Sequence, residues 1–180
     1  HWTTINYRES FDIFTTCGIL FNHESPLRGD EFVTKKITKG LARIKMGKQE
    51  ILNLGNIYSQ RDWGHTEDYV EAMWRMLQVE TPDDYVIATG RTENIKTFVD
   101  LSCKKLGFDI SWVGEGLNEE CIDIKTGKPL VKINKDLFRP NEVDILIGDA
   151  SKAEKRLDWK PKSTLEELCS EMVDFDLKNL

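Results

Sequence analysis

The chain has 180 residues, of which 39% are hydrophobic and 31% charged, and its formal net charge is −6. This length allows one good core or slightly more than one domain, and the composition is ordinary for a globular protein. The acidic balance argues against a general nucleic-acid binder, and no apolar run is long enough to span a membrane. The four cysteines are widely spaced, without a C-x-x-C pair. This spacing predicts reduced thiols in a cytoplasmic protein and no metal site.

The first segments indicate the end of a larger sheet. Large apolar residues in helix-like spacing predict a helix over residues 1–15, and the chain opens with neither an initiator Met nor a leader sequence. We therefore expect a piece of a longer protein. Residues 17–22 form a short, nearly all-apolar run, typical of a strand buried on both faces. The polar loop at residues 22–29 follows this strand, where open α/β sheets bind ligands.

The rest of the chain alternates helical and extended patterns. Helices are predicted over four ranges and after Thr164. The ranges are residues 31–46, 66–78, 94–106 and 150–157. Strands are predicted at residues 85–89, 110–113, 121–124 and 131–133, with short extended pieces between 51 and 63. The second helix should be capped by Thr66 and turn four apolar side chains inward: Tyr69, Val70, Met73 and Leu77. This alternation is typical of the α/β class.

Two polar clusters have the chemistry of anion sites. Asn22, His23 and Arg28 share the first loop, and Lys36 follows in the next helix; amide, guanidinium and ammonium groups donate hydrogen bonds to phosphate. The alternative is a solvated loop with capping residues.

The second cluster contains Arg61 beside Asp62, and Arg139 before Pro140. It could form weak surface ion pairs or a bidentate grip on phosphate. The Gly55-Asn56 turn also lets a ligand approach the backbone closely.

Two expected signatures are absent. Residues 114–119 begin like G-x-G-x-x-G, but Glu119 occupies the last glycine position, so this is no dinucleotide fingerprint. None of the four tyrosines has a lysine four residues later. Residue types and spacing alone indicate an α/β lobe with possible anion sites.

Three motifs in order carry a more specific resemblance. They are N-H-E-S-P at residues 22–26, R-D-W-G-H at 61–65 and R-P-N-E-V-D at 139–144. Together they resemble the GDP-mannose 4,6-dehydratase family of extended short-chain dehydrogenases/reductases, from Trp2 to Leu177. The resemblance implies an α/β chain that forms the carboxy-terminal part of such an enzyme. Residues 1–22 would be the tail of its Rossmann domain, and residues 23–180 mainly its sugar-nucleotide-binding domain, with some segments returning to the Rossmann sheet.

The same resemblance implies a function for the whole protein. This family converts GDP-mannose to GDP-4-keto-6-deoxymannose and water, as a step toward GDP-fucose. In this family NADP accepts a hydride from sugar C4 and returns it to C6. The implied cofactor contacts are His23 and Arg28. The implied substrate contacts are Asn22, Val33, Lys36, Leu54, Gly55, Asn56, Arg61, Arg139 and Glu142. Leu27 departs from the family, because many relatives carry a second arginine there. Dimers or tetramers are expected.

The resemblance also implies that the catalytic Ser/Thr and Glu and the Tyr-x-x-x-Lys pair precede His1, so no catalytic residue is expected in this chain and the chain alone should be inactive. A stand-alone nucleotide-sugar-binding or regulatory module is the alternative, and a sugar-nucleotide epimerase fits the motifs less well. The intact mass of the natural protein would separate a piece of a full-length dehydratase from a stand-alone module.

Overall fold

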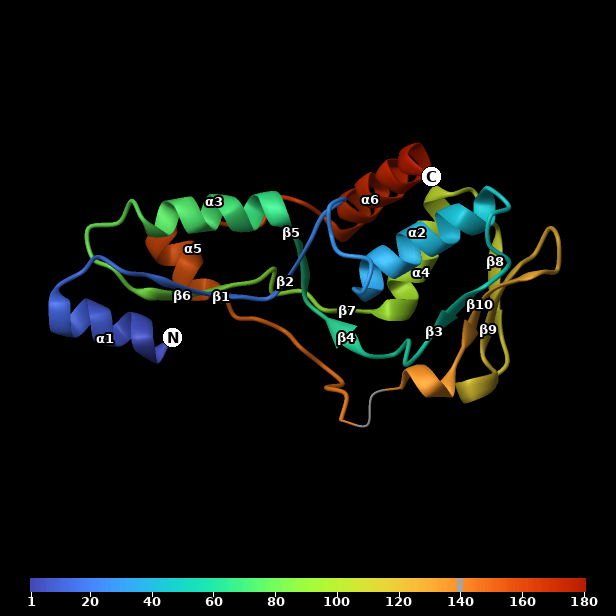
Figure 1. The fold of residues 1–180 in the computed structure, drawn as a ribbon, viewed down its shortest axis with the longest axis horizontal. Coiled ribbons are helices and arrows are strands. Elements are labelled where there is room, and N and C mark those ends of the chain that lie inside the picture. The colour runs from blue at the N-terminus through green and yellow to red at the C-terminus, as the bar shows by residue number, and fades with distance from the viewer. Residues whose placement is uncertain (139–140) are drawn as a thin grey trace. The chain divides into compact units, whose positions relative to one another are not determined.

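The structure is a computed structural model that describes residues 1–138 and 141–180. It forms two compact units, each built from segments far apart in the sequence (Figure 1). Unit 1 contains residues 1–23, 62–92 and 147–164, and unit 2 contains residues 24–61, 93–146 and 165–180.

Unit 1 is built around a two-stranded parallel sheet. Its elements are α1 (Trp2–Phe11), β1 (Cys17–Leu20), β2 (Asn22–Glu24, whose last residue begins unit 2), β5 (Trp63–His65), α3 (Thr66–Met76), β6 (Asp84–Ile87) and α5 (Ser151–Leu157). β1 pairs with β6 in parallel register, with Cys17 opposite Asp84. α3 belongs to the crossover that a parallel pair requires, and runs beside these strands (Figure 1). β2 and β5 form a second short ladder.

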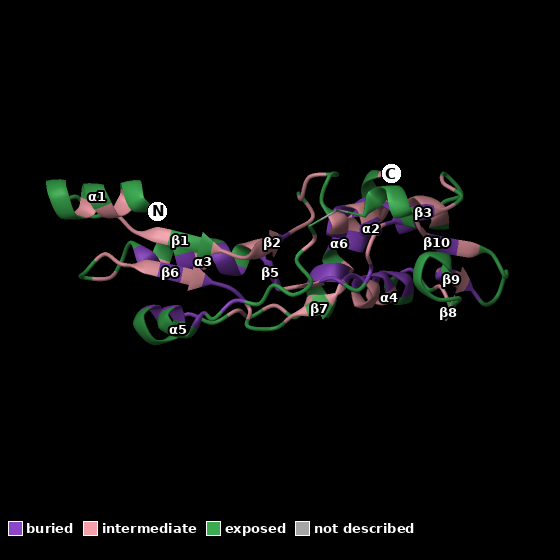
Figure 2. Ribbon diagram, turned by 90° about the horizontal axis from the view of Figure 1, so that it is seen from below, coloured by how far each residue is buried: buried purple, intermediate pink, exposed green. Residues whose placement is uncertain are grey.

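The core of unit 1 lies where α3 and α5 pack on β6. Tyr69 and Met76 of α3 are buried with Tyr85 of β6, Leu157 of α5 and Trp159 beyond it. Figure 2 shows these helices with one buried side and one exposed side. Burial of such side chains stabilises the unit by about 1.5–3 kcal/mol each.

Three sequence-based expectations for unit 1 are wrong. Val70, Met73 and Leu77 are exposed, because α3 carries two apolar stripes and turns the one containing Tyr69 toward β6. His65, not Thr66, caps α3, since its Nδ1 accepts a hydrogen bond of 3.1 Å from the Glu67 amide. β1 is only partly buried, because among the described residues it pairs with β6 alone.

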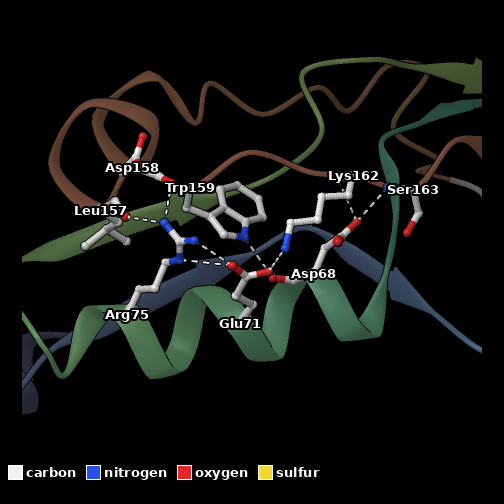
Figure 3. A network of polar contacts seen from close by, with 8 residues as sticks. All are labelled: Asp68, Glu71, Arg75, Leu157, Asp158, Trp159, Lys162 and Ser163. Atoms are coloured by element: carbon white, nitrogen blue, oxygen red, sulfur yellow. Dashed lines mark hydrogen bonds and ion pairs between the residues drawn. The ribbon is translucent and has the colours of Figure 1, made fainter.

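A polar network ties residues 157–163 to α3 (Figure 3). The Asp68 carboxylate accepts hydrogen bonds of 3.0 Å from the backbone amides of Lys162 and Ser163. Glu71 accepts from both Arg75 and Lys162, and Arg75 in turn donates to the carbonyls of residues 157 and 158. The segment that follows α5 is therefore held by defined donors and acceptors.

Unit 2 combines three helices with a mixed sheet. Its elements are α2 (Val33–Lys45), β3 (Leu52–Leu54), β4 (Gln60–Arg61), β7 (Glu93–Asn94), α4 (Ile95–Lys105), β8 (Ile110–Val113), η1 (Gly116–Asn118), β9 (Glu120–Asp123), β10 (Pro129–Ile133), η2 (Lys135–Leu137) and α6 (Leu165–Asn179). The sheet order is β3-β10-β9-β8, and β10 runs parallel to β3 but antiparallel to β9. β4 pairs with β7 separately. The three helices pack against one another, and α2 also contacts β3.

A buried ion pair joins the first and last helices of unit 2. The Lys35 ammonium lies 2.5 Å from the Asp176 carboxylate and donates to the Pro26 carbonyl at 2.9 Å. Thr38 donates to the second carboxylate oxygen of Asp176 at 2.7 Å. The three buried polar side chains of this group, Lys35, Thr38 and Asp176, therefore satisfy one another, as buried polar groups require.

All four cysteines are free, and no helix among the described residues is both long and apolar enough to cross a membrane.

Candidate functional site

Arg61 and Glu142, two of the predicted substrate residues, are direct partners in unit 2. The guanidinium of Arg61, at the end of β4, lies 3.1 Å from the Glu142 carboxylate and donates to the Val143 carbonyl at 2.7 Å. Backbone hydrogen bonds of Gln60 to residues 144 and 146 hold the same segment. The other predicted arginine of this cluster, Arg139, lies outside the described residues. Residues 142–146 are thus fixed beside β4.

Lys36 contributes a second cation to unit 2. Its side chain is partly buried on α2, and burial lowers the pKa of its ammonium group. Among the described residues, no hydrogen bond or ion pair satisfies this ammonium. An anionic ligand would therefore stabilise Lys36 more than it would a solvated lysine. Val33, another predicted substrate residue, begins the same helix and is partly exposed.

A cavity of about 200 Å³ lies beside the predicted Gly55-Asn56 turn. A Cβ atom at Gly55 would lie 2.6 Å from the Leu137 carbonyl oxygen, so the close approach of these segments requires glycine. The Asn56 side-chain oxygen accepts a hydrogen bond of 3.0 Å from the Tyr58 amide, which fixes the turn. Leu54 is a buried residue of β3 and does not line the cavity. The cavity is lined by Gly55, Asn56, Ile57, Tyr58, Gly116, Leu117, Ile133 and Phe138.

The loop predicted to contact the cofactor is divided between the two units. Asn22 and His23 lie on β2 in unit 1. His23 Nδ1 donates to the Phe21 carbonyl at 3.0 Å, which leaves Nε2 as the acceptor of the neutral ring.

Arg28 lies in unit 2, beside a buried carboxylate. Its Nε atom is 3.2 Å from Glu24, and its guanidinium stacks 3.4 Å from the ring centre of Phe32. That Nε–H has no well-directed hydrogen bond among the described residues. The arrangement holds a cationic fork in one orientation.

Asp62 has a role that the sequence analysis missed. The sequence offers it as an ion-pair partner of Arg61, but its buried carboxylate accepts hydrogen bonds from the Thr89 amide and hydroxyl and from the amides of Gly90 and Gly148, at 2.7–3.2 Å. Asp62 therefore connects two sequence segments of unit 1, because it binds residues 89–90 of its own segment and Gly148 of the segment at residues 147–164. The position of Asp62 next to Arg61 does not predict these contacts, because Thr89 and Gly148 are 27 and 86 residues away in the sequence.

One group of possible metal ligands occurs among the described residues, namely His1, Cys17 and Asp84. The Asp84 carboxylate already pairs with Arg8 at 2.5 Å. The group is explained by this ion pair, and we assign no metal to it.

Solved structures identify the class of fold. RMD from Pseudomonas aeruginosa, complexed with NADPH, superimposes with a TM-score of 0.81 and 19% identity over 99% of this chain and 53% of that one. A dTDP-glucose 4,6-dehydratase from Bacillus anthracis, in complex with NAD, has a TM-score of 0.74 and 19% identity over 99% of this chain and 49% of that one. The chain has the mixed α/β fold of about half of an extended short-chain dehydrogenase/reductase, which confirms the predicted fold class.

Sequence comparison identifies the family. The family model described as GDP-mannose 4,6 dehydratase matches residues 1–172. A GDP-mannose 4,6-dehydratase of Sinorhizobium fredii (strain HH103) is 51% identical over 180 residues, covering 100% of this chain and 51% of the relative. Its counterpart in Dictyostelium discoideum is 52% identical over 178 residues, covering 99% and 50%. The chain belongs to the GDP-mannose 4,6-dehydratase family, as predicted, and spans about half the length of these curated relatives.

Proposed function

We propose that the complete protein carrying this sequence is an NADP-dependent GDP-mannose 4,6-dehydratase, and that this chain binds the sugar nucleotide without supplying catalytic residues. The family match over residues 1–172 carries the proposal. Hydride and the O4 proton would be removed at sugar C4, and the C5 proton would leave with the C6 hydroxyl as water. Hydride would then return to C6 while a proton returns to C5. We further propose that the complete protein is a cytoplasmic homo-oligomer, and that the 180-residue chain alone is inactive.

Unit 2 would bind the diphosphate, the sugar hydroxyls and the nucleobase of GDP-mannose. Arg61 and Arg139 would donate to the diphosphate, because a guanidinium presents paired donors to phosphate oxygens. Lys36 would supply a further positive charge, and Glu142 would accept from a ribose or sugar hydroxyl. The cavity at Gly55 and its neighbours would receive the nucleobase, since its walls are largely apolar.

NADP would supply the hydride acceptor and donor of this internal redox cycle. His23 and Arg28 are the residues of this chain that we assign to it. Arg28 fits an anionic cofactor, because stacking on Phe32 orients its guanidinium and its Nε–H lacks a well-directed acceptor among the described residues. Together with Asn22 on β2, these residues would bind and orient ligands rather than move protons.

Calorimetry with GDP-mannose on the complete protein tests the substrate assignment. Losing a charged hydrogen-bonding partner costs about 1.5–3 kcal/mol, so Arg61→Ala and Arg139→Ala should each weaken binding from roughly tenfold to more than a hundredfold. Arg43→Ala is the control, because the guanidinium of this α2 arginine donates a hydrogen bond to the Lys48 carbonyl at the surface and is not assigned to the ligand. Parent-like affinity in both site variants would remove these arginines from the site.

A further inference from the structure

The cavity beside Gly55 has walls from separate parts of unit 2. One wall is the turn at residues 55–58, which leads into β4, and another is η1, represented by Gly116 and Leu117. These segments are about 60 residues apart and would be free to separate without a connection. The width of the cavity therefore depends on what joins them.

Glu119 provides this connection. Its side chain is 4% exposed, and its two carboxylate oxygens accept hydrogen bonds of 2.5 Å from the Tyr58 hydroxyl and the Lys96 ammonium. Burial alone would raise the pKa of Glu119, but the hydrogen bonds from Lys96 and Tyr58 outweigh it and lower this pKa. The Glu119 carboxylate is thus charged at neutral pH. It accepts hydrogen bonds from Tyr58, which lines the cavity, and from Lys96 of α4.

Lys96 is itself fixed from several sides. It lies in the first turn of α4, with its ammonium 4.5 Å from the ring centre of Trp112 and 5.7 Å from that of Tyr58. The Trp112 indole donates to Asp100 of the same helix at 2.8 Å. Cation–π contact and hydrogen bonding therefore restrict the Lys96 side chain to one position.

We infer that Lys96, Glu119 and Tyr58 form a positioning group that holds the Tyr58 ring as a fixed wall against the planar ring of the ligand, which is a nucleobase under the proposed function on which this inference rests. Tyr58 is 55% exposed and is one of the residues that line the cavity. An exposed aromatic side chain normally samples several rotamers, and fixing it before binding removes an entropic cost of association. The group should thereby improve discrimination between bases of different size.

The test measures the dissociation constants of GDP and UDP for the complete protein by calorimetry. Glu119→Gln and Lys96→Met should weaken GDP binding by about two- to tenfold and weaken UDP binding less, because an immobilised side chain contributes on that scale. The ratio of the UDP constant to the GDP constant should therefore fall. Steady-state kinetics should show a higher KM for GDP-mannose at unchanged kcat, the pattern of lost ground-state binding.

Glu120→Gln is the matched control, since Glu120 is the adjacent residue and makes a more exposed ion pair with Lys132. It should leave the ratio unchanged. Tyr58→Phe keeps the ring and loses only the hydroxyl, so it supplies a second variant if Glu119→Gln fails to fold.

Several outcomes would overturn the inference. One is an unchanged ratio of the UDP to the GDP dissociation constant in Lys96→Met together with either Glu119→Gln or Tyr58→Phe. Another is an equal loss of affinity for GDP and UDP in these variants. The third is a parent protein that binds GDP and UDP equally well. A parent that binds neither GDP nor GDP-mannose would refute the proposed function as well, which keeps the two failures distinguishable.

Discussion

Lys35 and Lys36 are adjacent on α2, but their ammonium groups have opposite surroundings. Successive side chains on a helix differ by about 100° in direction, so Lys35 faces Asp176 of α6 while Lys36 does not. Lys35 is neutralised within the fold, whereas Lys36 is partly buried with a lowered pKa and no partner among the described residues. Of the two, Lys36 is the cation that a bound phosphate would stabilise.

Replacing Arg28 tests the assignment of the loop at residues 22–29. Arg28→Ala in the complete protein should reduce the NADP that copurifies with it more than it reduces affinity for GDP-mannose. The physical reason is that the cationic fork held by Glu24 and Phe32 would be lost. Copurifying NADP is measured by absorbance after denaturation, and sugar-nucleotide affinity by calorimetry.

Arg28→Lys separates charge from geometry, because lysine keeps the charge but lacks the planar fork. We expect an intermediate loss of NADP. If copurifying NADP stays constant in Arg28→Ala while GDP-mannose affinity collapses, the loop contacts the other ligand.

The α2–α6 contact gives a prediction for stability at the level of elements. Lys35→Met leaves the Asp176 carboxylate buried without its cation, and breaking a buried pair in this way costs about 3–5 kcal/mol. Thr38 would keep its hydrogen bond to Asp176 and limit the loss. Urea denaturation followed by circular dichroism should show a lower midpoint for the variant.

The double variant Lys35→Met/Asp176→Leu is the control for packing. Replacing both charges with apolar groups avoids the unpaired carboxylate, so the double variant should be more stable than Lys35→Met alone. A double variant as unstable as the sum of its two single variants would show that the ion pair has no special role.

Unit 1 exposes apolar surface that a stable unit would normally cover. None of the α1 residues is buried, and Trp2 and Phe11 are 79% and 63% exposed. Arg8 holds the helix through Asp84 and the Thr15 carbonyl. Burial of large apolar side chains is the main source of helix stability in proteins. α1 therefore has little local stability in this chain.

Hydrogen exchange on the 180-residue chain tests this view. Amides of α1 should exchange at least about a hundredfold faster than those of α2, because opening α1 exposes little additional surface. We further expect the rest of the complete protein to cover these apolar side chains, so α1 should be more protected there than in the 180-residue chain. Equal protection of α1 and α2 in a monomeric chain would contradict the prediction and favour the stand-alone binding module.

Sequence alone identified the α/β class, the family and most helices. The apolar spacing predicted an amphipathic helix over residues 31–46, and α2 buries Ile37 and Leu41 there, because a periodic stripe is a local property of the chain. The motif at residues 61–65 similarly pointed to the family, since order and spacing are preserved without reference to three-dimensional contacts.

Only the tertiary structure decided which residues are partners. α3 carries two apolar stripes, and its packing on β6 selected the one with Tyr69. Arg61 pairs with Glu142 rather than its neighbour Asp62, and Tyr58 meets Glu119 across 61 residues of sequence. Such contacts depend on how strands and helices are arranged in space, and short-range periodicity contains no information about that arrangement.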